Sequence, residues 1–202
     1  PPHPPTTHTY TYIASSAASD VYKRQASAFN TEKLQWLNQY YIKEADINDL
    51  AADLGQRLKS LSIDLSDGPL LEDVVLVLQD RVKTLVELAE KATMFYRDYD
   101  AFDANAAKKQ LRPVVMEPLK VFRERLEGLD DWTGEEIQHL LEGTAEEFEL
   151  KMGKIGQPVR VAVTGAGASP SIDQTLFLMG KERTLRGLDK ALNYIEKRAA
   201  DS

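Results

Sequence analysis

The sequence contains no cysteine and only three histidines, at positions 3, 8 and 139. The absence of cysteine excludes disulfides and thiolate metal sites. With so few imidazoles, we expect neither a metal centre nor a catalytic triad built on histidine. No apolar run approaches the roughly 18 residues of a membrane-spanning helix, so we expect no membrane contact and a cytoplasmic location.

Charge is unevenly distributed along the chain. The 202 residues carry a formal net charge of −7, with 43% hydrophobic and 28% charged residues, as in an ordinary globular protein. Residues 151–202 have a surplus of four positive charges, whereas residues 1–150 have a net charge of −11. A basic C-terminal end can still bind a polyanion locally, although the overall acidity argues against nucleic acid.

Residues 1–26 differ from the rest of the chain. The segment begins PPHPPTTHTYTY, is rich in Pro, Thr, Ser and Ala, and shows no helical period. It also lacks the basic start and continuous apolar core of a signal peptide. We predict a disordered, non-native tail, such as a tag or cloning scar.

Helical patterns begin at Phe29. The stretch FNTEKLQWLNQYYIKEAD predicts a helix capped by Asn30 or Thr31, with Leu34, Leu37 and Tyr41 on one face. Residues 47–61 predict a second amphipathic helix. A third is expected to start just before Pro69 and to run without interruption through residue 88.

The second half of the chain is also helical in pattern. Pro118 is expected to open one helix, and TGEE and TAEE, starting at Thr133 and Thr144, predict capping boxes. Residues 181–199 carry a leucine and isoleucine stripe. Because the segment 97–113 is polar, we predict an all-α protein with two helical subdomains, residues 27–103 and 104–202.

The stretch VRVAVTGAGASPSID, residues 159–173, admits two interpretations. As a dinucleotide-binding turn it has Gly165 and Gly167, but Pro170 stands where the third glycine belongs and no second strand follows. As a helix–loop–helix corner, it ends a helix of residues 158–164 at a left-handed Gly165, and Ser169 caps the next helix. The corner would expose N–H groups and a hydroxyl beside Arg160, which suits contact with a splayed base.

The remaining motifs provide no catalytic group. KMGK, residues 151–154, resembles the KMSKS signature of class I aminoacyl-tRNA synthetases but lacks its serine, and no HIGH signature precedes it. We interpret its lysines as solvated charges and His139 as a surface residue. Arg81 either lies along its own helix or offers a guanidinium fork to a base or phosphate.

Two long stretches resemble one family. FNTEKLQWLNQYYIK and GKIGQPVRVAVTGAGASPSIDQTLFLMGKERTLRGLDKAL are similar to the C-terminal, anticodon-binding half of bacterial glutamyl-tRNA synthetase, and the resemblance covers about residues 27–199. It implies an α-helical cage of two subdomains that grips the anticodon arm of tRNA(Glu), and a helical GQPVRVAVTG. It also implies that ATP and Mg²⁺ belong to a catalytic domain N-terminal to this region, so no cofactor is expected here.

The resemblance also implies which residues read the anticodon. The family's helix-borne arginine aligns with Arg81, and its loop contacts align with Ser169 and Ile172, which flank Pro170, with Arg160 nearby. Some members have Thr and Leu where this chain has Ser169 and Ile172, so the hydroxyl and the apolar character are kept.

On the resulting hypothesis, Lys181, Arg183 and Arg186 supply phosphate contacts, and the chain is a monomer that binds no DNA and has no catalytic or metal-ligating residue. Two alternatives stay open. The acidic net charge favours a helical protein-interaction scaffold, and the TGAGAS loop favours an NAD- or ATP-dependent enzyme with a parallel sheet.

Overall fold

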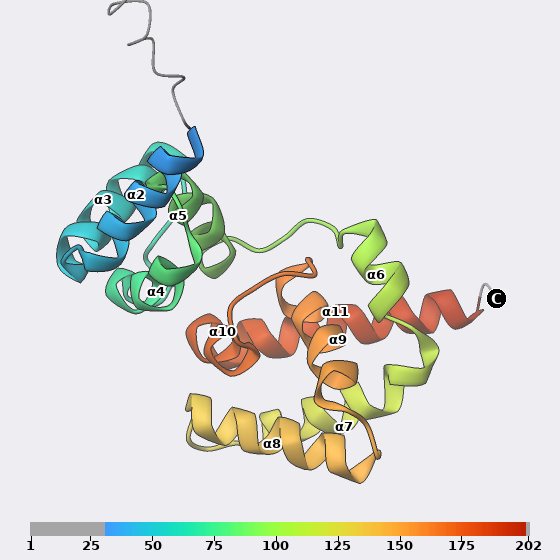
Figure 1. The fold of residues 1–202 in the computed structure, drawn as a ribbon. Coiled ribbons are helices and arrows are strands. Elements are labelled where there is room, and N and C mark those ends of the chain that lie inside the picture. Colours follow the sequence, from blue (N-terminus) through green and yellow to red (C-terminus); the bar gives the residue numbers. More distant parts are fainter. Residues whose placement is uncertain (1–30, 201–202) are drawn as a thin grey trace, which may run out of the picture.

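A computed structural model describes residues 31–200, and the regular elements in that range are all helices. Figure 1 shows two groups of helices, α2 to α5 at upper left and α6 to α11 at lower right, joined by one connecting segment. The predicted all-α fold is confirmed, and residues 31–200 contain none of the strands that a parallel sheet requires. The predicted disordered tail, residues 1–26, lies outside the described residues.

The first group is built from short amphipathic helices. Its elements are α2 (Thr31–Glu44), α3 (Ile47–Ser60), α4 (Leu71–Leu78), the 3-10 turn η1 (Gln79–Arg81), α5 (Leu85–Ala92) and the 3-10 turn η2 (Thr93–Phe95). The Asp46 carboxylate caps α3 by accepting from the Asn48 N–H at 2.8 Å. Leu50, Leu54 and Leu58 are buried on one face of α3, which confirms the second amphipathic helix.

The helix expected over residues 69–88 is broken, which corrects the prediction. Helix α4 begins two residues after Pro69, and the chain extends at Val82 (φ −124°, ψ 151°) before α5 begins. Thr84 Oγ1 accepts from the Glu87 N–H at 3.1 Å, and the Glu87 carboxylate accepts from the Lys83 N–H at 2.8 Å. These bonds provide a new N-cap where a continuous helix would have none. Arg81 therefore ends a 3-10 turn rather than lying within a helix.

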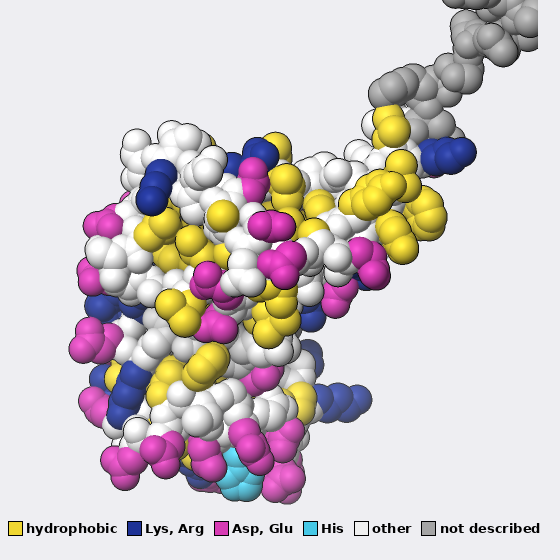
Figure 2. Space-filling view, turned by 90° about the vertical axis from the view of Figure 1, so that its left-hand side faces the viewer, with side chains coloured by type: hydrophobic (Ala, Val, Ile, Leu, Met, Phe, Trp, Pro, Cys, Tyr) yellow, Lys and Arg dark blue, Asp and Glu magenta, His cyan; other side chains and the backbone are white. Residues whose placement is uncertain are grey.

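The apolar face predicted for α2 is exposed to solvent. Leu34 and Leu37 are 43% and 39% exposed, and Tyr41 is 62% exposed. Figure 2 shows hydrophobic side chains gathered over α2 at the upper right of the molecule. Ile42 is the buried residue of this helix. The apolar pattern thus predicts the helix correctly, but its face is not packed within residues 31–200.

The second group packs around its last helix. Its elements are α6 (Ala104–Gln110), the 3-10 turn η3 (Pro113–Val115), α7 (Met116–Glu127), α8 (Gly134–Glu147), α9 (Met152–Thr164), α10 (Ile172–Met179) and α11 (Lys181–Ala200). Leu188 and Ile195 of the predicted α11 stripe are fully buried, and Leu185 and Leu192 are half-buried. At Gly187, an added Cβ would lie 2.7 Å from the Ala162 carbonyl oxygen. Helices α9 and α11 therefore cross where no side chain separates their backbones.

Of the two predicted capping boxes, one is confirmed at its N-cap only, since the Thr133 N–H donates to the Asp131 carbonyl at 3.0 Å, and the other is wrong. Thr133 Oγ1 accepts from the Glu136 N–H at 3.3 Å at the start of α8. Thr144 instead lies buried inside α8, where its hydroxyl donates to the Leu140 carbonyl at 2.8 Å and accepts from Arg125 at 2.9 Å. Because these bonds satisfy the hydroxyl inside the helix, Thr144 caps nothing.

Helix α9 is longer than expected. It begins at Met152 and continues through Pro158 to Thr164, so the helical interpretation of residues 159–163 is confirmed and the predicted start at Pro158 is wrong. Gly165 ends it in the left-handed conformation (φ 73°), as predicted. Helix α10 has Ser171, not Ser169, at its N-cap position. Helix α6, within the polar segment expected to be a boundary, is capped by Asp103, which accepts from the Ala106 N–H at 2.7 Å.

Candidate nucleic-acid interface

A loop of seven residues, 165–171, connects α9 to α10, and we call it the corner loop. Its path is fixed by side chains rather than by a regular element. Thr164 Oγ1 accepts from the Ala166 N–H at 3.1 Å, just after the left-handed Gly165. Ser169 Oγ lies 3.1 Å from Thr175 Oγ1, which donates to the Ser171 carbonyl at 2.8 Å. The corner loop is therefore held in shape before any ligand binds.

Arg160 of α9 holds the far side of the corner loop. Its Nε donates to Ser169 Oγ at 2.8 Å and its Nη2 donates to the Pro170 carbonyl at 3.0 Å. Nη1 makes no hydrogen bond within residues 31–200, and the Arg160 side chain is half-buried. Since Thr175 donates its own hydroxyl proton to Ser171, Ser169 donates toward Thr175 or Pro170 and keeps one free lone pair.

Arg81, from the first group, lies close to Arg160. Burial lowers the pKa of Arg160, and the positive charge of Arg81 lowers the pKa further. Helix α10, which follows the corner loop, packs against α4, which precedes Arg81. The Arg81 side chain is exposed, and its carbonyl accepts from Lys91 Nζ at 2.8 Å. Arg81 of the first group is therefore close enough to Arg160 of the second for its charge to disfavour the charge of Arg160.

Pro170 and Ile172 are placed beside this region but are buried. Ile172 is 8% exposed and starts α10, and Pro170 is enclosed by the corner loop and its neighbours. Their side chains support the loop and offer little surface to a ligand. Contact of Ile172 with a base therefore stays a prediction, with a small contact area.

The three residues expected to bind phosphates differ in availability. Lys181 Nζ donates to the Leu129 carbonyl at 2.7 Å, and the Arg183 side chain, 18% exposed, pairs with Asp98 at 2.9 Å. Arg186 is 59% exposed and lies 3.4 Å from the same carboxylate. The structure gives Lys181 and Arg183 partners within the protein and leaves Arg186 open to solvent.

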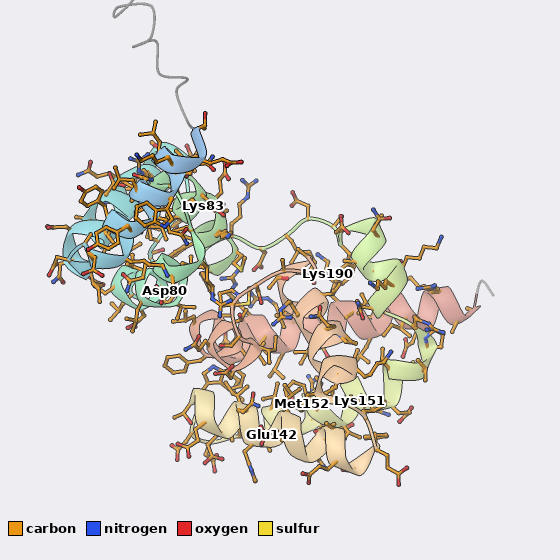
Figure 3. All side chains as sticks on the ribbon, viewed as in Figure 1. Asp80, Lys83, Glu142, Lys151, Met152 and Lys190 are labelled. Atoms are coloured by element: carbon orange, nitrogen blue, oxygen red, sulfur yellow. The ribbon has the colours of Figure 1, made fainter. Side chains whose placement is uncertain are left out.

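The interpretation of KMGK as solvated residues agrees with the structure. Lys151 and Lys154 are exposed and Met152 is 37% exposed, at the opposite end of α9 from the corner loop. Figure 3 labels Lys151 and Met152 low in the second group, between α8 and α9. His139 is exposed, and residues 31–200 contain no cluster of His, Asp or Glu that could hold a metal ion. No helix in the described range is long and apolar enough to span a membrane.

Sequence reasoning missed two parts of this region. Thr175 completes the hydrogen bonds of the corner loop, and its spacing of four from Ser171 on a helix was an available signal. Asp98, which pairs with Arg183 and Arg186, lies at least 85 residues away from both in sequence, so no local pattern could have paired them.

Comparison with known proteins agrees with the helical fold. A family model described as an anticodon binding domain matches residues 31–192. A crystal structure of a glutamate tRNA ligase from Elizabethkingia meningosepticum, in complex with its amino acid, superposes with a TM-score of 0.75 at 24% identity. The match covers 83% of this chain and 33% of that one. The glutamate-tRNA synthetase of Elizabethkingia anophelis gives a TM-score of 0.70 at 25% identity, over 82% of this chain and 32% of that one.

The chain thus spans about a third of the length of each of these ligases. The family model covers nearly all of the described helices. The chain therefore belongs to the anticodon-binding domain family, and residues 31–200 have the fold of the corresponding part of glutamate–tRNA ligases.

Proposed function

We propose that residues 27–202 form the anticodon-binding module of a glutamate–tRNA ligase and bind the anticodon arm of tRNA(Glu). One observation supports this most strongly: the positive charge of Arg81, in the first helical group, acts on Arg160, which holds the corner loop of the second group, and α4 packs against α10 between them. Two cations held near each other are stabilised when an anionic or carbonyl oxygen comes between them. RNA offers both kinds of oxygen, on its phosphates and on its unpaired bases.

Each side chain has a distinct role in this proposal. Arg81 presents its planar fork to a base edge or phosphate, and Arg160 donates from Nη1 while its other nitrogens hold the loop. Ser169 accepts from a base amino group through its free lone pair. Pro170 and Ile172 are buried and support the corner loop from the protein interior.

Phosphate contacts add affinity without sequence information. Arg186, which is exposed, is the best placed of the three predicted phosphate ligands. Lys181 and Arg183 would first have to leave their protein partners, the Leu129 carbonyl and the Asp98 carboxylate. We expect binding to weaken as salt rises, since each phosphate contact releases condensed counterions.

The chemistry of the parent enzyme would take place elsewhere. A glutamate–tRNA ligase attaches glutamate to tRNA(Glu) with ATP and Mg²⁺ for protein synthesis, and we propose that a separate catalytic domain does so in the cytoplasm. We expect this chain to bind tRNA as a monomer without activating an amino acid, and to bind neither DNA nor membranes.

Titration of the full chain with a tRNA(Glu) anticodon stem–loop tests the proposal. Arg81→Ala should weaken binding by about 1–3 kcal/mol, the usual contribution of an arginine fork to a base. Lys59→Ala is the matched control, because it removes one exposed charge from α3 in the same helical group. Arg160→Ala should also weaken binding, with Lys151→Ala at the other end of α9 as its control.

If neither arginine variant changes affinity, the assignment of these residues is wrong. The exposed apolar face of α2 favours one alternative, a helical protein-interaction scaffold without RNA binding. No binding of the stem–loop at low salt, together with capture of a protein partner that Trp36→Ala abolishes, would establish that alternative instead.

A further inference from the structure

The segment that connects the two helical groups, residues 96–103, is fastened to the second group. We call it the linker. Tyr99 Oη donates to the Ala162 carbonyl at 2.6 Å, and the Asp103 N–H donates to the Gly165 carbonyl at 2.8 Å. Lys190, labelled in Figure 3, donates to the Tyr99 carbonyl at 3.0 Å and lies 4.1 Å from the centroid of the Tyr99 ring. The linker is thus part of the α9–α11 surface.

Arg183 of α11 reaches past the linker to the first group. Its Nη1 donates to the Phe95 carbonyl and its Nη2 to the Met94 carbonyl at 3.3 Å, at the C-terminal end of η2. The same guanidinium pairs with Asp98, the third residue of the linker, with Nε and Oδ1 2.9 Å apart. One side chain of the second group therefore binds both the end of the first group and the linker.

Asp98 is the other half of this arrangement. Burial alone would raise the pKa of its carboxyl, but the hydrogen bond and charge of Arg183, with Arg186, outweigh burial and lower it. The guanidinium of Arg183 donates to a carboxylate and to two backbone carbonyls, and only 18% of its side chain is exposed. An arginine with this many internal partners is poorly placed to bind a phosphate as well.

We propose that Arg183 and Asp98 form a latch that fixes the two helical groups at the separation needed for Arg81 and Arg160 to engage one RNA. This inference rests on the proposed function. It makes Arg183 a positioning residue, which acts through Asp98 and the end of η2, and not a phosphate contact. The consequence is that anticodon reading depends on a contact that itself touches no RNA.

The direction in which Asp98→Ala changes RNA affinity distinguishes the latch from a phosphate contact. Asp98→Ala removes a negative charge and with it the anionic partner of Arg183, whose bonds to the Phe95 and Met94 carbonyls are left. If Arg183 bound phosphate, this variant would bind the anticodon stem–loop more tightly. The latch requires weaker binding, by about 2- to 30-fold, the range for residues that modulate coupling between sites without touching a ligand. Tighter binding would overturn the latch.

Salt dependence gives an independent readout. Arg183→Met keeps the side-chain length without the charge. As a phosphate contact, its loss would reduce the slope of log affinity against log salt by about 0.7. The latch predicts weaker binding with an unchanged slope, and additional loss of Asp98 should then have little further effect. Arg186→Gln is the positive control: it removes the exposed charge that we propose binds phosphate and leaves the Arg183 pair intact, so it should reduce the slope by about 0.7. A reduced slope in Arg183→Met would contradict the proposal.

A readout without RNA keeps the two proposals distinguishable. Because the chain has no cysteine, Lys59→Cys and Lys154→Cys give unique spin-label positions, one exposed residue in each helical group. Asp98→Ala and Arg183→Met should broaden the distance distribution between the labels while circular dichroism shows the helices intact, and Arg183→Lys should partly restore it. An unchanged distribution in a variant that still folds would refute the latch. Failure of the unsubstituted chain to bind RNA would refute the proposed function and leave the distance result standing.

Discussion

Gly165 joins the corner loop to the linker, and Gly165→Ala should destabilise the protein by about 2 kcal/mol. Its backbone is left-handed (φ 73°), which costs a residue with a Cβ about 1–2 kcal/mol. The added Cβ would also lie 2.6 Å from Tyr99 Cγ, so the ring must move and its 2.6 Å hydrogen bond to the Ala162 carbonyl is lost, for about 1 kcal/mol more. The reduced entropy of the unfolded chain offsets about 0.4–1 kcal/mol of this.

Thermal and urea unfolding measure the effect of Gly165→Ala. For a domain of this size, 2 kcal/mol corresponds to a fall in melting temperature of about 4–8 °C. Gly167→Ala in the same loop is the matched control, because its Cβ would meet only Ala106 Cβ at 3.8 Å. We expect the control to stay within about 0.5 kcal/mol of the unsubstituted chain. Equal stabilities for the two variants would refute the role assigned to the Tyr99 contact.

Two further predictions follow from the hydrogen bonds of the corner loop and of the latch. Thr175→Val removes the hydroxyl between Ser169 and Ser171, and should lower the free energy of unfolding by about 1–2 kcal/mol and weaken RNA binding. Thr93→Val, which loses a bond to the Ala89 carbonyl, should lower stability and leave RNA affinity unchanged; equal RNA affinities for the two variants would contradict the prediction. Asp98 has a lowered pKa in the folded protein, so its stabilisation is present above the unfolded value of 3.8 and is lost as the pH falls through the folded value. The stability difference between Asp98→Ala and the unsubstituted chain should therefore shrink in acid, as measured by urea unfolding from pH 7 to pH 3, and a difference independent of pH would show that the carboxylate charge does not matter.

Patterns within one element were sufficient to predict much of the fold. The stripe of α11 identifies a helix whose Leu188 and Ile195 are fully buried, because helical periodicity is set by nearby residues. The left-handed end of α9 at Gly165 was likewise predictable, since glycine adopts that conformation without a steric cost. Helix class, and a helix end set by a left-handed glycine, depend on short-range chemistry, which the sequence displays directly.

The errors arose where two local signals competed. Residues 69–88 have continuous apolar periodicity, yet the chain breaks because Thr84 and Glu87 supply a cap in the middle of it. The motif from Thr84 to Glu87 was visible and would have indicated the break. Thr144 shows the reverse case, in which a capping motif lies inside a helix because its hydroxyl has partners there.

The candidate site required information that no single element contains. The resemblance to a family supplied Arg81, Ser169 and Ile172 at separate places in the sequence, and the structure adds that Arg81 lies near Arg160. The internal pairing of Arg183 with Asp98 spans 85 residues and has no local signature. Whether a basic residue is available for RNA or is used within the protein is decided by tertiary contacts.

A double-substitution cycle on RNA affinity tests the central claim most directly. The affinities of the unsubstituted chain, Arg81→Ala, Arg160→Ala and the double variant for the tRNA(Glu) anticodon stem–loop are measured at one salt concentration. If the two arginines engage one RNA surface, the effects of the single substitutions will fail to add, with a coupling of at least about 0.5 kcal/mol. Strictly additive effects, or no effect of either substitution, would show that the region between Arg81 and the corner loop is not the reading surface.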